Sequence, residues 1–399
     1  MRVRNPTYLL IAFILLTPLW MWLAWYLMPK RQLVAAIVDK TVLRPDGQEH
    51  ISLTWILNHE RFTKTKYDGY TIEQDYFGFF PLENQQYRIK GLERFTDQQL
   101  AQLSRDADLA YYTDTYGIYR QEWFQTGKEA ERSGIIYGGM SRNDAHFLSL
   151  MKQNHKLVMA EFNDINSPTD PGVRNKFEST FGLHWTGWIG RFFDSLDTTV
   201  NQELPPWMVR NYKRQHNGQW PFTKSGLVYV SENDTVVVLE EDTHLARRVP
   251  QMLASATGQS KFNLPARIRY TYWFDVLTYD ARINEEIATY EVYPTARGRL
   301  ELARYGLPTR FPAILMHDAP DYAFYYFAGD FCDNPVSMSS AYFRGIEWLS
   351  PVSYLTEGLT ERKGFFWRVY RPMVTRILDN YYDRRQRKNP SSARKQADE

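Results

Sequence analysis

Acidic side chains follow several apolar runs of this sequence, at the points where predicted parallel strands end. In an open α/β sheet these carboxyl ends meet at one edge, which is where such sheets bind ligands. The acidic residues at or after these points include Asp114, Glu161 and Asp194. Two carboxylates about 5–10 Å apart can act as acid and base on a glycosidic bond. We therefore take these three as the candidate catalytic residues.

Aromatic, amide and guanidinium side chains accompany the three carboxylates. The candidates for ligand binding are Tyr116, Asn163, Trp185, Trp188 and Arg191. Aromatic rings can stack on sugars while carboxylates and amides hydrogen-bond hydroxyl groups, so this combination suits a carbohydrate. Structural alternatives stay open, because Asp and Asn after a strand commonly cap helices or form turns and Trp commonly fills a core.

Cys332 is the only cysteine of the chain, so it can form neither an intramolecular disulfide nor a Cys-based zinc or redox motif. Asp330 and Asp333 flank it and form a second candidate site, with a simple turn as the alternative. The sequence has no G-x-S-x-G, Walker, H-E-x-x-H or G-x-G-x-x-G motif. The common serine hydrolases, ATPases, zinc peptidases and NAD enzymes are excluded, and we expect no metal and no cofactor.

Alternating strand and helix patterns must position these residues. The β-rich apolar run 33–38 predicts a strand buried on both faces of a parallel sheet, and 109–113 and 156–162 predict further strands. Between them, 97–106 predicts a helix, and Ser141 starts a capping box that opens another. Successive strand–helix units imply a parallel sheet with right-handed crossovers.

The later chain has a different pattern. Residues 226–239 predict a hairpin, and the alternating runs within 267–292 predict antiparallel strands. We therefore predict an α/β domain over 33–240 and a mixed α/β or antiparallel extension over 241–380.

The segment 135–163, IIYGGMSRNDAHFLSLMKQNHKLVMAEFN, resembles the core of class I glutamine amidotransferase-like (flavodoxin-like) domains. The resemblance implies that 33–240 adopts that fold, with a strand, a Gly-Gly turn, a helix and a strand that ends at the site. Enzymes of this family use a nucleophilic Cys in a tight strand-to-helix turn, with His and Glu partners. Cys332 lies outside the matching region, so the resemblance does not extend to glutamine hydrolysis.

Residues 8–28 contain no charged side chain and are rich in aromatic residues toward their end. At about 1.5 Å per helical residue they could cross a hydrocarbon core of about 30 Å. The sequence thus predicts a signal-anchor transmembrane helix after a short cytoplasmic tail, 1–7, with the body outside a bacterial inner membrane. The basic segment 381–399 is predicted to be a disordered tail, either solvated or in contact with anionic lipid headgroups.

The composition is that of a folded protein: the 399 residues are 43% hydrophobic and 24% charged, with a net charge of +2. This charge excludes a general nucleic-acid binder. Three functions stay open. The chain is a membrane-anchored envelope protein whose non-glutaminase amidotransferase-like domain binds a carbohydrate or another envelope ligand, a glycan-acting hydrolase with paired carboxylates, or a scaffold subunit of a membrane complex.

Overall fold

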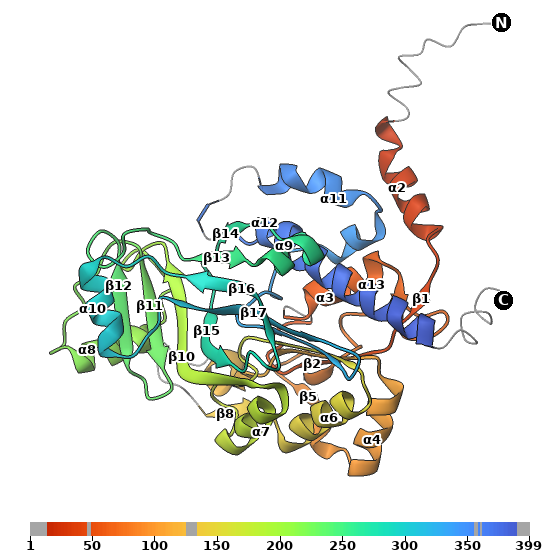
Figure 1. Ribbon diagram of the computed structural model, residues 1–399, viewed down its shortest axis with the longest axis horizontal. Helices are drawn as coiled ribbons and strands as arrows, with labels where there is room; N and C mark the ends of the chain where they lie inside the picture. The colour runs from red at the N-terminus through yellow and green to blue at the C-terminus, as the bar shows by residue number, and fades with distance from the viewer. Residues whose placement is uncertain (1–13, 46–48, 125–133, 355–357, 360, 389–399) are drawn as a thin grey trace, which may run out of the picture.

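A ten-stranded mixed sheet is the largest feature of the computed structural model, which describes residues 14–45, 49–124, 134–354, 358–359 and 361–388 (Figure 1). The central strands β18, β9, β6, β2 and β4 run parallel to one another, and antiparallel strands extend the sheet on both sides. In spatial order the strands are β14 (Arg267–Arg269), β13 (Gln251–Ala254), β16 (Glu285–Glu291), β17 (Arg310–Asp318), β18 (Ala323–Phe327), β9 (Leu157–Glu161), β6 (Leu109–Asp114), β2 (Ala35–Asp39), β4 (Phe77–Pro81) and β5 (Tyr87–Lys90).

Helices cover both faces of this sheet. On one side α4 contacts α6 and α6 contacts α7, while on the other α13 contacts α3 and α9 (Figure 1). Local sequence determines where they begin: Thr96 and Ser141 form complete capping boxes at α4 and α6, and Asp170 caps α7. The helices are α3 (Ile51–His59), α4 (Asp97–Asp106), α6 (Arg142–Gln153), α7 (Pro171–Phe181), α9 (Ala256–Phe262) and α13 (Arg371–Lys388).

A second, four-stranded antiparallel sheet packs beside the first. Its spatial order is β12 (Val236–Glu240), β11 (Gly226–Ser231), β10 (Leu183–Phe193) and β15 (Phe274–Tyr279), and α8 (Pro206–Gln215) and α10 (Ala296–Arg304) contact β12. A β-bridge between Phe274 and Gly329 joins the two sheets. Within the second sheet, Gly190 of β10 leaves room for its partner on β15, since a Cβ there would lie 2.5 Å from the Phe274 ring.

Short elements complete the described chain. They are α2 (Thr17–Tyr26), β1 (Arg31–Gln32), β3 (Phe62–Thr63), η1 (Leu92–Arg94), β7 (Ile118–Tyr119), α5 (Arg120–Phe124), β8 (Ile135–Tyr137), η2 (Met338–Tyr342), α11 (Ile346–Leu349), η3 (Ser350–Tyr354), α12 (Lys363–Phe365) and the π-helical turn η4 (Phe366–Tyr370).

The predicted fold class, a parallel-sheet core preceded by a transmembrane helix over 8–28, is wrong. The fold is mixed α/β with a large mixed sheet, and no helix in the described ranges has both the length and the apolar character needed to cross a membrane. The helix α2 covers only Thr17–Tyr26, and 1–13 lie outside the described residues. The aromatic end of the charge-free run packs on the body instead: Trp25 Nε1 donates to the Asn58 carbonyl at 3.0 Å, and the Arg61 guanidinium lies 4.8 Å from the Trp25 ring centroid.

The C-terminal segment also differs from its prediction. Helix α13 continues to Lys388, so the first part of the predicted disordered tail, 381–388, is helical. Arg384 and Arg385 form ion pairs with Asp318 and Asp108. These basic side chains therefore attach the helix to the sheet, whereas 389–399 lie outside the described residues.

Candidate functional site

A cavity of about 300 Å³, here called the strand-end cavity, lies where the parallel strands of the large sheet end. The segments after β2, β6, β9 and β18 line one side of it, and β10 and β11 of the second sheet line the other. This is the edge of an α/β sheet at which ligands bind in known folds. Its acidic and amide side chains are Glu49, Asp114, Glu232, Asp330, Asn163 and Asn166.

Aromatic rings form much of the remaining wall, namely those of Tyr116, Phe162, Trp185, Trp207 and Trp273. The rings of Phe162 and Trp273 are nearly parallel, with 6.5 Å between centroids and 8° between planes. Trp185 is held in place, because its Nε1 donates to the Trp188 carbonyl at 2.9 Å and the Arg174 guanidinium lies 4.6 Å from its ring centroid.

Asp114 is the centre of a hydrogen-bond network at the end of β6. Its Oδ1 accepts from Thr41 Oγ1 at 2.8 Å and from the Tyr116 amide at 2.6 Å, and its Oδ2 accepts from Asn163 Nδ2 at 3.0 Å. Burial nevertheless raises the pKa of Asp114 to about 7, because removal from water disfavours the carboxylate more than these donors favour it. Near neutral pH this carboxyl group can therefore both donate and accept hydrogen bonds.

Asn166 supplies an acceptor that no described group uses. Its side chain is 4% exposed and lines the strand-end cavity, and its Oδ1 has no hydrogen-bond partner among the described residues. Its Nδ2 donates to Asn163 Oδ1 at 3.2 Å, which fixes the orientation of the amide. A buried acceptor without a partner costs free energy, and because this oxygen is itself covered, a ligand would contact it only after the Asn166 side chain moved.

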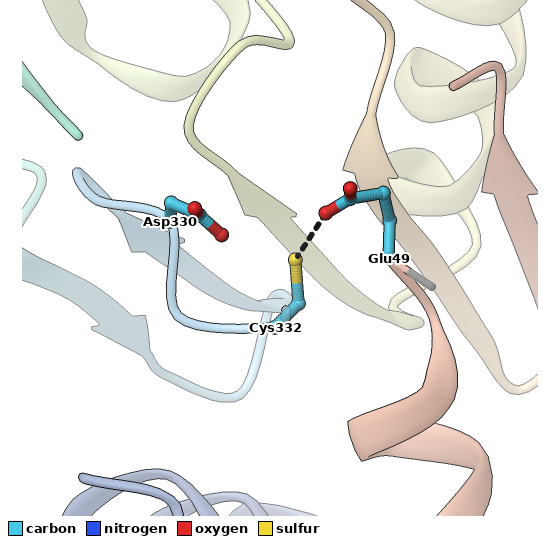
Figure 2. Close-up of side chains that lie close together, drawn as sticks. All are labelled: Glu49, Asp330 and Cys332. Carbon is cyan, nitrogen blue, oxygen red and sulfur yellow. Dashed lines mark hydrogen bonds between the residues drawn. The ribbon is translucent and has the colours of Figure 1, made fainter. Parts of the chain in front are cut away.

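Glu49 and Asp330 point toward one another from opposite sides of Cys332 (Figure 2). One carboxylate oxygen of each and the Cys332 sulfur lie within 4.8 Å of one another. The sulfur lies 3.9 Å from Glu49 Oε2. Arg362 Nη1 donates to Asp330 at 2.9 Å and to Asp333 at 3.0 Å, so one guanidinium compensates these two carboxylates.

The pKa shifts distinguish the members of this cluster. Burial, followed by the charges of Asp333 and Asp330, raises the pKa of Glu49 well above its ordinary value, which favours its protonated form at neutral pH. Burial and the neighbouring Glu161 and Glu49 raise the pKa of the Cys332 thiol well above its ordinary value. A protonated, buried thiol is a poor nucleophile, so Cys332 lacks the activation that thiol enzymes require.

The same cluster has a donor set that could hold a divalent cation, with two carboxylate oxygens and one sulfur. Glu49 and Cys332 would both have to lose a proton before binding it, because the pKa of each is raised.

The structure brings four of the predicted site residues together: Asp114, Tyr116, Asn163 and Trp185 all line the strand-end cavity. Trp188 does not line it. The Trp188 ring lies 6.0 Å from the ring of Tyr305.

Glu161, Asp194 and Arg191 also lie outside the lining. Glu161 is fully buried, and its Oε1 accepts from Tyr111 Oη at 2.6 Å and from Tyr370 Oη at 3.1 Å. Asp194 is exposed and follows β10. Arg191 lies within β10 and pairs with Glu203. The expected convergence of Arg191 and Asp194 with the other strand ends fails because β10 belongs to the second, antiparallel sheet.

Sequence reasoning missed Glu49, Asn166, Trp207 and Trp273 as site residues. Each lies in a connection or at a helix start, where no periodic pattern indicates which way a side chain points. Asp330 was predicted only as part of a second site, yet it lines the same cavity as Asp114. The aromatic richness of the chain was the only sequence signal for the two tryptophans.

No family model matches the chain, and neither does any curated protein. Solved structures with a similar fold include a glutamine amidotransferase from Thermotoga maritima, with a TM-score of 0.34 and 7% identity over 88% of this chain and 98% of that one. Others are a putative ThuA-like protein from Bacteroides uniformis (TM-score 0.33, 9% identity, 79% of this chain and 89% of that one) and the carbohydrate deacetylase Agd3 (0.28, 10%, 75% and 30%). The likeness is one of fold alone, and at these TM-scores it carries no assignment of function.

Proposed function

We propose that the strand-end cavity binds a carbohydrate or another ligand rich in hydroxyl groups. The observation that carries this proposal is the convergence of Trp185, Trp207 and Trp273 with acidic and amide side chains on one cavity of about 300 Å³. That volume is at the lower end of the range for small-molecule sites, about 300–1,000 Å³. It suits a small sugar or one end of a longer one.

The polar groups of the lining favour a neutral ligand that donates hydrogen bonds. Among the described residues that line the cavity, none is Lys, Arg or His, whereas Glu49, Asp114, Glu232 and Asp330 are acidic. Glu232 is already paired with Arg174 and Asp330 with Arg362, so the described lining offers an anionic group no free cation. The hydroxyl groups of a sugar could donate to the carboxyl oxygens of the lining, while its apolar ring faces pack on the indoles.

Titration with a panel of neutral mono- and disaccharides tests the proposal, with tryptophan fluorescence and calorimetry as readouts. We expect saturable binding to the wild type. We expect Trp207→Ala to weaken it roughly tenfold or more, since loss of a central aromatic contact costs about 2 kcal/mol or more. Trp348→Ala is the matched control, because Trp348 is 84% exposed on α11 and lies outside the cavity lining. Equal affinities of the two variants, or no binding by the wild type, would contradict the proposal.

A second candidate function, hydrolysis of a glycosidic bond, is favoured by the pairing of Glu49 with Asp330. Their nearest carboxylate oxygens lie within 4.8 Å, which is closer to the separation of about 5–5.5 Å in retaining glycosidases than to the 6.5–9.5 Å of inverting ones. Glu49, whose pKa is raised, would donate its proton to the leaving oxygen while the Asp330 carboxylate bonds to the anomeric carbon. A water molecule deprotonated by Glu49 would then release the sugar from Asp330.

Two substitutions distinguish this enzyme from a binding protein. With aryl glycosides as probes, Glu49→Gln and Asp330→Asn should abolish turnover and leave sugar binding within a few-fold of the wild type. Asp106→Asn is the control, because Asp106 is exposed on α4 and lies outside the lining of the strand-end cavity. Binding without turnover by the wild type leaves the binding function alone. If the protein is instead a scaffold subunit, the wild type neither binds the sugars nor turns over the glycosides, and none of these substitutions changes that result.

A further inference from the structure

Two more cavities continue from the strand-end cavity along residues 271–273. The first, here the middle cavity, has a volume of about 320 Å³ and shares Trp273 and Asp330 with the strand-end cavity. The second, here the arginine cavity, has a volume of about 260 Å³ and shares Thr271 and Tyr272 with the middle cavity. The shared residues make the middle cavity a neighbour of both the strand-end cavity and the arginine cavity.

Cationic side chains become more numerous from the strand-end cavity through the middle cavity to the arginine cavity. The strand-end cavity has acidic side chains and no cationic one among the described residues that line it. In the middle cavity Arg191 and Arg362 are balanced by Glu203, Asp330 and Asp333. The arginine cavity contains Arg267, Arg269 and Arg368, with Glu361 as the acidic residue of its lining. A ligand that fits this gradient is neutral at one end and anionic at the other.

The three arginines come from two elements that face one another. Arg267 and Arg269 lie two residues apart on the edge strand β14, and both are exposed while Ile268 between them is buried. Arg368 belongs to η4 and is also exposed. None of the three forms an ion pair with a described residue, in contrast to Arg191 and Arg362. Their guanidinium groups therefore retain their donors for a ligand.

Aromatic side chains line the path between the two ends. Tyr272 Oη donates to the Glu361 carbonyl at 2.7 Å, and the Arg362 guanidinium lies 4.4 Å from the Tyr272 ring centroid. The next residue, Trp273, faces the strand-end cavity and the middle cavity. A sugar ring could pack on Trp273 at the boundary of these two cavities, whereas the Tyr272 ring is buried beneath Arg362.

We infer that the ligand is an oligosaccharide that carries an oxyanion, a carboxylate or a phosphate, which Arg267, Arg269 and Arg368 bind in the arginine cavity. The inference rests on the proposed function and adds the substrate class to it. Guanidinium groups bind both oxyanions through paired charge-assisted hydrogen bonds, so the chemistry is shared by a uronic acid and a sugar phosphate.

Oligosaccharides of equal length that differ only at one end test the inference: a neutral one, one ending in a uronate, and one ending in a phosphorylated sugar. By calorimetry we expect the wild type to bind at least one acidic ligand roughly tenfold or more tighter than the neutral one, as charge-assisted hydrogen bonds predict. The preferred acidic ligand identifies the oxyanion. The advantage should shrink at high ionic strength, because salt screens exposed charges.

Substitutions show whether the arginine cavity is the source of that advantage. Arg267→Ala combined with Arg269→Ala should remove it and leave the affinity for the neutral oligosaccharide unchanged. Arg368→Gln, on a different element, gives a second variant should the first fail to fold, and Arg282→Ala on a distant turn is the control. The inference is overturned, while the proposed function stands, if both arginine variants still bind the acidic ligand more tightly than the neutral one. Equal binding of acidic and neutral ligands by the wild type overturns it as well. If no oligosaccharide binds the wild type, both fail.

Discussion

Glu161 was predicted to be a catalytic residue, but the structure places it in the core. Its replacement by Gln tests how strongly burial of its carboxyl group affects the free energy of unfolding. The carboxyl group is fully buried, with Oε1 bound by the hydroxyl groups of Tyr111 and Tyr370 and with Oε2 lacking a partner among the described residues. Burial raises the pKa of Glu161 to about 8. The amide of Gln has the same shape, keeps an oxygen for both tyrosines and cannot ionise, so it removes the titration with little change in packing.

The sign of the effect follows from where Glu161 holds its proton. Between its ordinary pKa of 4.5 and the value of about 8 in the folded protein, the folded state retains a proton that the unfolded state loses. The free energy of unfolding therefore falls as the pH rises through this window and levels off above it. Since one pKa unit corresponds to about 1.36 kcal/mol, the full loss is about 5 kcal/mol, as an order of magnitude.

Urea unfolding followed by tryptophan fluorescence at pH 5 and pH 9 measures this difference. At pH 5 the wild type and Glu161→Gln should agree within about 1 kcal/mol, the size of one hydrogen bond. At pH 9 the variant should be more stable by several kcal/mol. Asp114 and Asp275, with pKa values raised to about 7, destabilise both proteins alike at alkaline pH and cancel in the comparison. The exposed Glu83→Gln is the control. Parallel pH profiles of Glu161→Gln and wild type would refute the assignment of Glu161 to a dry core.

Two further predictions concern other buried groups. Lys40→Met should cost about 3–5 kcal/mol in urea unfolding, because Lys40 Nζ donates to Asp144 at 2.6 Å and its loss removes the cation that compensates this fully buried carboxylate. An unchanged midpoint would show that Asp144 is neutral or hydrated. Cys332 should resist alkylation by iodoacetamide at pH 7.5 until urea unfolds the protein, since it is 2% exposed and its thiol pKa is raised well above the ordinary value; rapid modification of the folded protein, detected by mass spectrometry, would contradict this.

Local sequence patterns predict the elements that depend on neighbouring residues alone. The helix predicted over 97–106 is α4, and the capping box at Ser141 opens α6, because a cap satisfies backbone donors within one turn. The runs 33–38 and 109–113 overlap all but the last residue of β2 and β6, and 156–162 contains β9; these strands pair in parallel. The hairpin predicted over 226–239 is formed by β11 and β12 of the second sheet. Patterns do not indicate that β10 and β15 join it, because these pairings depend on contacts between distant segments.

The site residues also show that local sequence patterns cannot predict contacts between distant segments. Asp114 and Glu161 both end parallel strands, yet Asp114 lines the strand-end cavity and Glu161 lies in the core. A register shift between β2 and β6 precedes Asp114, while Tyr370, from a segment 209 residues away along the chain, contacts Glu161. A strand end thus indicates where ligands bind but not which side chain faces them. Glu161 does not face the cavity because the C-terminal segment that contains Tyr370 covers it. Glu161→Gln should therefore alter the pH dependence of unfolding, whereas Asp330→Asn should alter turnover of a glycoside in the cavity.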